Sequence, residues 1–311
     1  MDLGFAVPVS GSWATPANQR QLARRAEDLG YASLWTFQRL LYPAGGTPLP
    51  VVYRSVLDPI VSLSYLAGLT ERIRLGLAIV NAPFYSPAVL AKQLATLDQL
   101  SDGRLDAGLG LGWSAAEFAA AGVPMTSRGR RVEEFLACLE ALWRDDPVEF
   151  HGEFYEVPRS HVDPKPKQQP RPPVLFGGFA EPALRRAGRI ADGWISGSTA
   201  DLTTIGTSIS AVQRAAVEAG RDPAALRFVV RGVVRLRPAG GTDRRALSGS
   251  IAEVRGDLHA LAEAGATEVF LDLNFDEQIG SPDADPATSV HLAMEVLEAF
   301  APDTDDPSAL A

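Results

Sequence analysis

The sequence predicts a (β/α)8 TIM barrel of the α/β class, and three observations support this. Eight short apolar runs of strand length alternate with helix-like segments along almost the whole chain. The 311 residues are enough for one barrel of this kind. A proline-rich insertion interrupts the alternation after the fourth strand, and the alternation then resumes. A doubly wound open sheet is the alternative that the same alternation permits.

The expected elements follow from apolar periodicity and from the residues that bound each run. The eight expected strands lie at 3–7, 33–37, 73–80, 105–109, 173–178, 193–195, 228–234 and 268–273. The expected helices lie at 16–29, 59–69, 87–100, from 114 onward, and at 128–143, 181–190, 201–219, 251–264 and 289–300. Cap and proline pairs mark several helix starts, as Thr15 with Pro16 and Asp58 with Pro59 do.

The insertion after strand four is expected at about 145–173, inside one domain that covers residues 1–300. It begins with a small hairpin at 151–155, and the six prolines of 157–173 predict a stretch without regular structure. Together with the loops at 38–52 and 272–286, the insertion is expected to shape a pocket. Residues 301–311 are expected to form a disordered tail.

Composition excludes several classes of protein. The net charge of −9, from 29 basic and 38 acidic residues, argues against a nucleic-acid or anionic-membrane partner. The sequence holds no apolar run of about 20 residues for a membrane helix and no signal-like start, so we expect a cytoplasmic protein. The single cysteine, Cys138, allows no internal disulfide and is expected to pack in a helix.

The most informative stretch runs over 92–113, KQLATLDQLSDGRLDAGLGLGW. Its helix is expected to stop at Gly103, a residue type that tolerates the left-handed conformation of a helix end. A strand follows and ends at Gly110 and Gly112, and Ser114 with Glu117 then forms a capping-box pattern. Glycines there would let a ligand lie flat against the backbone, near helix amides that favour anions. The alternative is a glycine-rich turn that only packs helix on strand.

Four stretches, in order, resemble the luciferase-like monooxygenase family, the bacterial-luciferase-like group of flavin- and deazaflavin-dependent oxidoreductases. The resemblance covers residues 1 to about 300. The stretches are GYASLW at 30–35, IRLG at 73–76, the segment 92–113, and FGG at 176–178 followed by ADGWI at 191–195. The family fold is a (β/α)8 barrel with an insertion after strand four.

The resemblance implies that an isoalloxazine or deazaflavin ring lies over the barrel mouth. It places a bulge at the end of strand three, with a non-prolyl cis peptide expected between Ala78 and Ile79. It implies a phosphate-binding turn of free backbone amides after strand five. The implied cofactor-binding residues are Gln38, Ala78, Ile79, Asn81, Gly110, Gly112, Trp113, Gly177, Gly178 and Phe179. Trp194 is expected to pack under the barrel end.

The chain departs from the family at the end of strand two. Deazaflavin-dependent members commonly carry an Asp-His pair there, and this sequence has Gln38-Arg39. We take both residues as the catalytic candidates. Gln38 can hydrogen-bond a ring or ribityl hydroxyl but cannot transfer a proton as a carboxylate could. Arg39 suits an anion or developing negative charge; the alternative for Arg39 is a solvated loop residue.

No other catalytic constellation competes in the sequence. The histidines His151, His161, His259 and His291 are scattered, and no metal-ligand pattern, Gly-x-Ser-x-Gly elbow or phosphate-loop lysine is present. The basic run 128–131 opens a helix that carries two glutamates, which favours a solvated charge cluster over a nucleic-acid patch.

The leading hypothesis is a two-electron oxidoreductase that uses coenzyme F420 and passes hydride between ring C5 and a small organic substrate. The second is an FMN-dependent monooxygenase, which takes reduced flavin and oxygen and needs a dry pocket. The third is a non-catalytic flavin-binding protein, which would retain the cofactor without turnover. Family members are often dimers, so a homodimer is expected. The substrate is not predicted.

Overall fold

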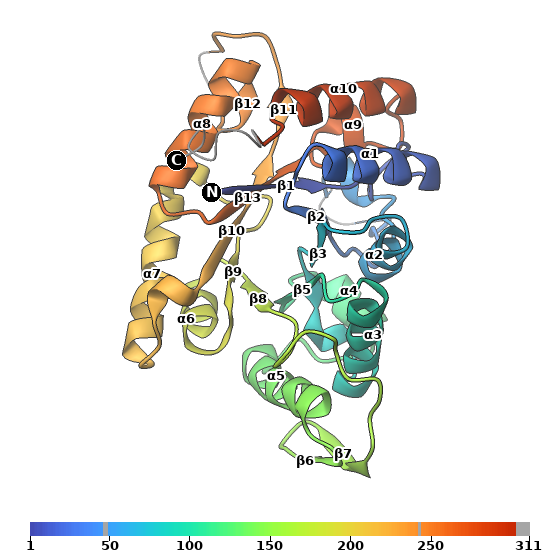
Figure 1. Cartoon of the computed structure of the whole chain (residues 1–311), viewed down its shortest axis with the longest axis vertical. Helices are drawn as coiled ribbons and strands as arrows, with labels where there is room; N and C mark the ends of the chain where they lie inside the picture. The colour runs from blue at the N-terminus through green and yellow to red at the C-terminus, as the bar shows by residue number, and fades with distance from the viewer. Residues whose placement is uncertain (46–48, 242–243, 303–311) are drawn as a thin grey trace.

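Parallel strands close into a barrel in the computed structural model, which describes residues 1–45, 49–241 and 244–302 (Figure 1). The strands run in the order β3-β2-β1-β13-β10-β9-β8-β5-β4, and an added pairing of β3 with β5 closes the ring. This confirms the predicted (β/α)8 barrel and excludes the open sheet. The strands are β1 (Asp2–Ala6), β2 (Ser33–Thr36), β3 (Arg74–Leu77), β4 (Val80–Asn81), β5 (Leu105–Gly110), β8 (Val174–Gly177), β9 (Gly193–Ile195), β10 (Arg227–Val233) and β13 (Glu268–Asp272).

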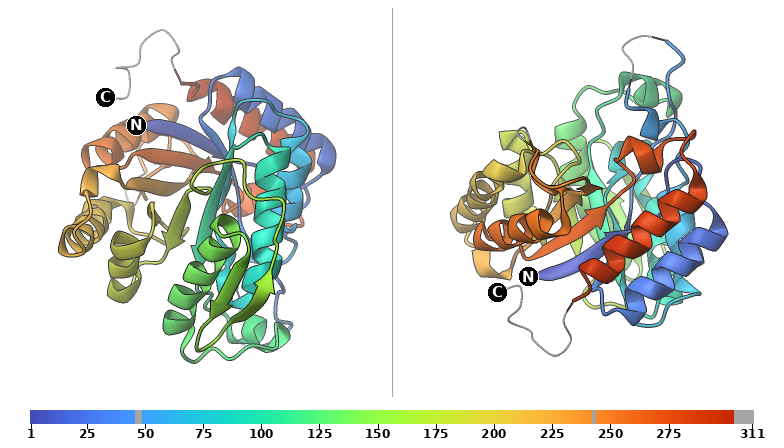
Figure 2. Two further views of the ribbon diagram at one scale, coloured as in Figure 1. Left: turned by 60° about the horizontal axis from the view of Figure 1, so that its bottom comes forward. Right: turned by 90° about the horizontal axis from the view of Figure 1, so that it is seen from above.

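Helices surround the barrel, and α1 and α10, blue and red in Figure 2, lie side by side. The α-helices are α1 (Pro16–Asp28), α2 (Pro59–Ala67), α3 (Pro87–Leu100), α4 (Ala115–Ala120), α5 (Arg128–Arg144), α6 (Glu181–Ile190), α7 (Ile205–Glu218), α8 (Ile251–Glu263), α9 (Glu277–Gly280) and α10 (Pro286–Ala299). The 3-10 helices are η1 (Val51–Tyr53), η2 (Ala82–Phe84), η3 (Leu202–Thr204) and η4 (Pro223–Ala225). Within the described ranges, no helix has the length and apolarity that a membrane crossing requires.

Most expected boundaries agree with the structure within a few residues. Two of the predicted caps form, because the Thr15 and Asp58 side chains accept hydrogen bonds from the amides of Asn18 and Val61. The same pattern predicts a cap at Ser86 before Pro87, and this prediction is wrong, because the Ser86 side chain makes no cap hydrogen bond. The last helix starts three residues earlier than expected, at Pro286 behind the Asp285 cap. The sequence analysis missed α9 and a two-stranded sheet of β11 (Arg235–Leu236) and β12 (Ser248–Gly249). The expected tail lies outside the described residues beyond 302.

The expected strand at 73–80 is wrong as one continuous element, because a bulge divides it. Gly76 of β3 pairs with Asp106, and Val80 of β4 pairs with Leu109. Four steps along β3–β4 therefore face three steps along β5, so one residue is extra. The bulge lies at the carboxyl end of the strand, where a TIM barrel carries its functional groups.

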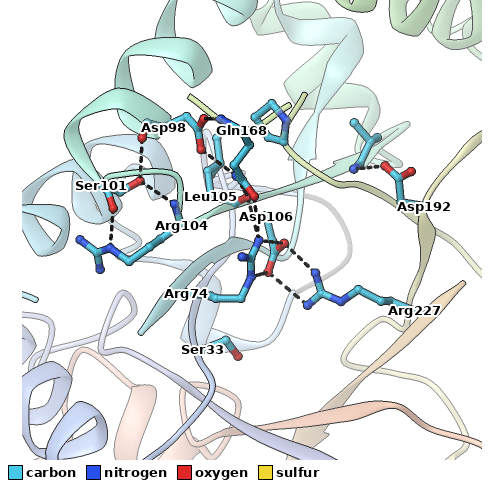
Figure 3. Close-up of polar contacts among 12 residues, drawn as sticks. Ser33, Arg74, Asp98, Ser101, Arg104, Leu105, Asp106, Gln168, Asp192 and Arg227 are labelled. Atoms are coloured by element: carbon cyan, nitrogen blue, oxygen red, sulfur yellow. Dashed lines mark hydrogen bonds and ion pairs between the residues drawn. The ribbon is translucent and has the colours of Figure 1, made fainter. Parts of the chain in front are cut away.

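The barrel interior is layered. At its amino-terminal end the buried Asp106 carboxylate accepts hydrogen bonds from Arg74 (Nε to Oδ2, 2.8 Å) and Arg227 (Nη1 to Oδ1, 2.6 Å), as Figure 3 shows. Arg227 also donates from Nη2 to Glu268 Oε2 at 2.9 Å. The layer above is apolar, and Trp35 stacks there on Phe270 with ring centroids 5.1 Å apart.

The insertion folds differently from the expectation. A hairpin of β6 (Val148–His151) and β7 (Glu156–Ser160) extends the predicted one, and its second strand occupies part of the stretch expected to be irregular. Pro158 is tolerated because the pairing register shifts within the hairpin, between Val148 and Phe150 on the opposite strand. The hairpin lies beside α5 (Figure 2).

The second half of the insertion does not shape the mouth. The Gln168 side chain donates from Nε2 to the Leu105 carbonyl at the start of β5 (2.8 Å). The backbone amide of Gln168 donates to the Asp98 carboxylate (2.9 Å). Lys165 binds the carbonyls of Leu142 and Asp145 at the end of α5. The expectation that this segment shapes the pocket at the mouth is wrong, because a segment that leads from a helix end to a strand start lies at the amino-terminal face of the barrel.

Candidate active site

The bulge after β3 is the feature of the barrel mouth around which the other candidate residues lie. The peptide bond between Ala78 and Ile79 is cis, as the sequence analysis expected. Ala78 is 6% exposed and Ile79 is half-buried, so the segment lines the mouth without projecting into solvent. Asn81, also buried, follows at the end of β4.

Glycines of β5 and β8 make room for the Ile79 side chain. A Cβ on Gly110 would overlap Ile79 Cδ1, and a Cβ on Gly177 would lie 3.1 Å from Ile79 Cγ2. A Cβ on Gly108 would overlap the carbonyl oxygen of Leu77 and approach Ile79 Cγ2 at 3.4 Å. The sequence analysis expected an external ligand to lie flat on Gly110. The group that lies there is the chain's own Ile79, so these glycines support the bulge directly.

A buried cation lies beneath the bulge. Arg231 of β10, 7% exposed, donates from Nη2 to the Ala78 carbonyl, and its Nε lies 3.3 Å from Asp272 Oδ2. The guanidinium carbon lies 5.2–5.4 Å from the ring centroids of Phe37, Phe270 and Phe275. Burial raises the pKa of the Asp272 carboxyl, although the neighbouring arginine opposes that shift.

The sequence analysis missed Arg231 as a site residue. The available signal was a charged residue inside the apolar run at 228–234, near the carboxyl end of a barrel strand. Arginine in such a place is almost never fully buried without a partner. The structure supplies those partners as a backbone carbonyl, a carboxylate and three aromatic rings.

Gln38 holds the other side of the bulge. Its Oε1 accepts a hydrogen bond from the Asn81 amide (2.8 Å), and its Nε2 donates to the Tyr85 hydroxyl (2.6 Å). Both ends of the amide are therefore engaged within the protein. Tyr85 is half-buried, and burial, assisted by Asp58, raises its pKa to about 12. Because the phenol oxygen accepts from Gln38, its own hydrogen remains available to a ligand.

Arg39 is not the solvated loop residue that the sequence analysis left as an alternative. Its side chain is 6% exposed and pairs through Nη1 with Glu117 Oε2 at 3.0 Å. Glu117 also accepts from the Leu40 amide (2.7 Å), so it does not complete the predicted capping box. Ser114 supplies only the first half of that motif, by accepting from the Glu117 amide. The ion pair with Glu117 balances the charge of Arg39 within the protein. The catalytic role of Arg39 stays a prediction.

The remaining predicted cofactor residues form two turns at neighbouring strand ends. Gly112 has a φ of 70°, and a Cβ there would lie 3.4 Å from Asn81 Cγ, so these two predicted residues are brought together. Gly178 has a φ of 141°, and its carbonyl accepts a hydrogen bond from the Trp194 indole (2.6 Å). Trp194 is 1% exposed, which confirms its expected packing role.

The large side chains beside these turns are exposed. Trp113 is 55% exposed and Phe179 is 71% exposed.

The four histidines are also exposed. Cys138 is fully buried, as expected for a packing residue, and burial raises its thiol pKa to about 11.

The residues present fit a planar aromatic group. Ile79 gives an apolar surface that Gly110 and Gly177 support from behind, and exposed aromatic rings stand at the rim. The turn after β8 leads into α6, whose first residue is acidic and whose N-cap, Ala180, makes no side-chain cap. In the first turn of that helix Pro182 has no amide hydrogen, and the amides of Ala183 and Leu184 donate to the Ala180 carbonyl. The Glu181 amide is therefore the one of these first four that is left to face an anionic group.

The fold is a closed (β/α)8 barrel whose mouth carries this bulge and the glycine turns after β5 and β8. The chain belongs to the luciferase-like monooxygenase family, whose model matches residues 3–239. Members of that family are oxidoreductases and monooxygenases.

Among curated relatives, an uncharacterised protein of Mycobacterium tuberculosis is 33% identical over 239 residues, which is 71% of this chain and 82% of that protein. The FMNH(2)-dependent dimethylsulfone monooxygenase of Pseudomonas putida is 40% identical over 136 residues, 42% of this chain and 37% of that enzyme.

Two solved structures share the fold. The monooxygenase RslO1 from Streptomyces bottropensis has a TM-score of 0.77 at 22% identity, covering 96% of this chain and 98% of that one. An F420-dependent secondary alcohol dehydrogenase, in complex with an F420-acetone adduct, has a TM-score of 0.76 at 19% identity, covering 97% and 99%.

Proposed function

We propose that the protein is a two-electron oxidoreductase that binds coenzyme F420 at the barrel mouth and passes hydride between ring C5 and an organic substrate. The observation that carries this proposal is the bulge at Ala78–Ile79, which Arg231 holds from below and Gln38 holds through Asn81. Side chains locked by second partners give a site the fixed geometry that hydride transfer needs.

The chain's residues would bind and orient the cofactor. Ile79 would back the ring, and Asn81 would offer its side-chain amide to the ring edge. The turn at Gly177 and Gly178 would face the phosphate. Gly112 would allow close approach of the chain between ring and phosphate. The bound deazaflavin would supply the hydride chemistry itself.

Tyr85 is the group best placed to meet a substrate oxygen. Gln38 orients its hydroxyl, and the pKa of about 12 keeps the phenol protonated near neutral pH. A protonated phenol can donate a hydrogen bond to a carbonyl or alkoxide oxygen while hydride moves. Gln38 then acts as a positioning residue, and Tyr85 touches the substrate.

An FMN-dependent monooxygenase is the second candidate, and the 40% identity to the dimethylsulfone monooxygenase favours it. Oxygen chemistry on a flavin requires a pocket that excludes water. At the mouth of the described structure, Trp113 and Phe179 are largely exposed, which favours hydride transfer over oxygen chemistry. The non-catalytic alternative predicts cofactor retention without turnover.

Titration of the purified protein with F420 and, separately, with FMN tests the proposal. Both cofactors are added in oxidised and reduced forms, and binding is followed by calorimetry. We expect F420 to bind and FMN to be ignored. Preference for reduced FMN would instead support the monooxygenase, and binding of neither cofactor would contradict both candidates.

A matched pair of variants places the binding at the mouth. Asn81→Ala removes one expected hydrogen bond and should weaken F420 binding roughly three- to tenfold. Arg130→Ala removes one member of a solvent-exposed ion pair with Glu153 and should leave F420 affinity unchanged. Equal effects of the two substitutions would contradict the assigned site.

A further inference from the structure

Arg39 lies between two aromatic rings at the mouth. Its guanidinium carbon is 4.4 Å from the centroid of the Tyr53 ring and 4.7 Å from that of Trp113. The guanidinium pairs with Glu117, and the two side chains are 6% and 2% exposed. The arginine therefore has a balanced charge and a fixed plane, and it contacts Trp113 directly.

Glu117 joins two loops through this arrangement. One carboxylate oxygen binds Arg39 and the other accepts the Leu40 amide, so α4 is tied to the segment after β2. A buried ion pair contributes little net stability, since desolvation offsets the attraction. What the pair fixes here is geometry, namely the orientation of the rings that lie on the guanidinium.

Trp113 is unusual among the tryptophans. Trp13, Trp35, Trp143 and Trp194 are 0–3% exposed, whereas Trp113 is 55% exposed. Its indole contacts Arg39, and Trp113 directly follows Gly112, whose Cβ position lies 3.4 Å from Asn81 Cγ at the end of β4. A large exposed aromatic side chain on the functional face of a barrel is typical of a ligand-binding wall.

We propose that Arg39 and Glu117 are positioning residues that hold Trp113 as a stacking wall for the substrate, and that the substrate presents a planar aromatic or conjugated group to it. This inference rests on the proposed function, because the wall serves a substrate at the cofactor site. It gives Arg39 a role different from the catalytic one, and Trp113 a role different from the cofactor-binding one, that the sequence analysis expected. The cation polarises the indole from one side, and a planar π-system stacks on the open side.

Fluorescence quenching by acrylamide, an uncharged quencher, tests the first half of the proposal without any ligand. The quenchable emission should come almost entirely from Trp113, because the other four tryptophans are buried. Trp113→Phe should abolish it. Arg39→Met and Glu117→Gln should each increase the quenching constant, since the indole loses its support. Unchanged quenching in both variants would overturn the positioning role.

A pair of probes with one carbon skeleton tests the second half. 2-Naphthol is planar, and decahydro-2-naphthol is its saturated counterpart. In the cofactor-free protein we expect 2-naphthol to bind about tenfold more tightly, the order of one aromatic stacking contact. Trp113→Ala should remove that preference, and Arg39→Met should reduce it. Val217→Ala, an exposed apolar change on α7, should leave it intact.

The outcomes separate this inference from the proposed function. Equal affinity of the wild-type protein for the two naphthols would overturn the stacking wall, whatever the cofactor titration shows. A Trp113→Ala protein that loses F420 and 2-naphthol affinity alike would also overturn it, because Trp113 would then be a cofactor contact. Arg39→Lys keeps the cation and guards against loss of the fold in Arg39→Met. It should retain the preference better than Arg39→Met does.

Discussion

The two ends of the barrel use buried charge in different ways. At the amino-terminal end Asp106 is fully buried and both of its oxygens accept hydrogen bonds from Arg74 and Arg227. At the mouth, Arg231 and Asp272 form a looser ion pair, with Nε 3.3 Å from Oδ2 and neither of these two atoms in a hydrogen bond within the described residues. The base is held by directed hydrogen bonds, whereas the mouth combines this looser pair with exposed aromatic rings.

This difference follows what each end does. A satisfied network closes the base and ties strands β3, β5, β10 and β13 together, and the insertion covers it through Gln168 (Figure 3). Buried charged groups that lack directed hydrogen bonds are costly, and such groups are candidates for function. The comparison therefore supports a stabilising role for the base and the proposed ligand site at the mouth.

The largest expected effect comes from Gly108→Ala. The new methyl group would overlap the Leu77 carbonyl oxygen, which belongs to rigid backbone. Overpacking of this kind costs about 3 kcal/mol or more, and we expect little folded protein by circular dichroism. Gly110→Ala is the matched variant, because its methyl group meets only the end of the Ile79 side chain. The Gly110→Ala protein should fold, but the displaced Ile79 side chain should lower its cofactor affinity. Normal cofactor affinity would contradict the proposal that Ile79 backs the cofactor ring.

The next largest effect should come from Asp106→Asn at the base. The substitution leaves two half-buried arginines without their carboxylate. Loss of one partner of a fully buried pair costs about 3–5 kcal/mol, and the partial exposure of Arg74 and Arg227 puts the expected loss at the lower end, about 3 kcal/mol. Urea unfolding measures the change. Arg130→Ala, which breaks an exposed pair with Glu153, should cost less than about 1 kcal/mol. Similar losses in both variants would contradict the structural importance of the base layer.

Acid should reveal the same layer. Burial alone would raise the pKa of Asp106, but hydrogen bonds and charge from Arg74 and Arg227 outweigh it and hold the pKa below its usual value. The carboxylate therefore contributes stability above the unfolded-state pKa of about 4, and this is lost as the pH falls through the folded pKa. The unfolding free energy of wild type should fall more steeply below about pH 4 than that of Asp106→Asn. Parallel curves would contradict this.

Tyr85→Phe should have the smallest effect on stability, about 1 kcal/mol or less, since one hydrogen bond to Gln38 is lost. F420 affinity should be unchanged, because the hydroxyl is assigned to the substrate. The raised pKa of Tyr85 stabilises the fold below about pH 10, and that contribution is lost as the pH rises toward 12. Alkaline unfolding should lose this component in the variant. A loss of F420 affinity would instead make Tyr85 a cofactor contact.

The sequence was sufficient for the fold and for the cis peptide at the end of strand three. The alternation of strands and helices predicts the barrel, and the family resemblance led to the cis peptide at Ala78–Ile79. Both depend on local pattern. The role of Gly110 could not be read this way, because whether a glycine receives a ligand or the chain's own Ile79 depends on tertiary packing.

Pairing across the chain was the other information that the sequence did not hold. Arg39 and its partner Glu117 are separated by 78 positions in the sequence. Arg231 and Ala78, whose carbonyl it binds, are separated by 153 positions. Nothing in their local sequence identifies these partners. The placement of the insertion failed for a related reason, since its prolines indicated an irregular segment but not which end of the barrel it covers.

Hydrogen–deuterium exchange, with and without saturating F420 or FMN, tests the contrast between the two ends most directly. We predict that the cofactor protects three peptides at the mouth. They cover the bulge at 76–86, the turn after β5 at 108–118 and the turn after β8 at 175–183. Peptides from the base, covering 163–173 and 224–228, should exchange at unchanged rates. Protection confined to the base peptides would contradict the assignment of ligand binding to the mouth.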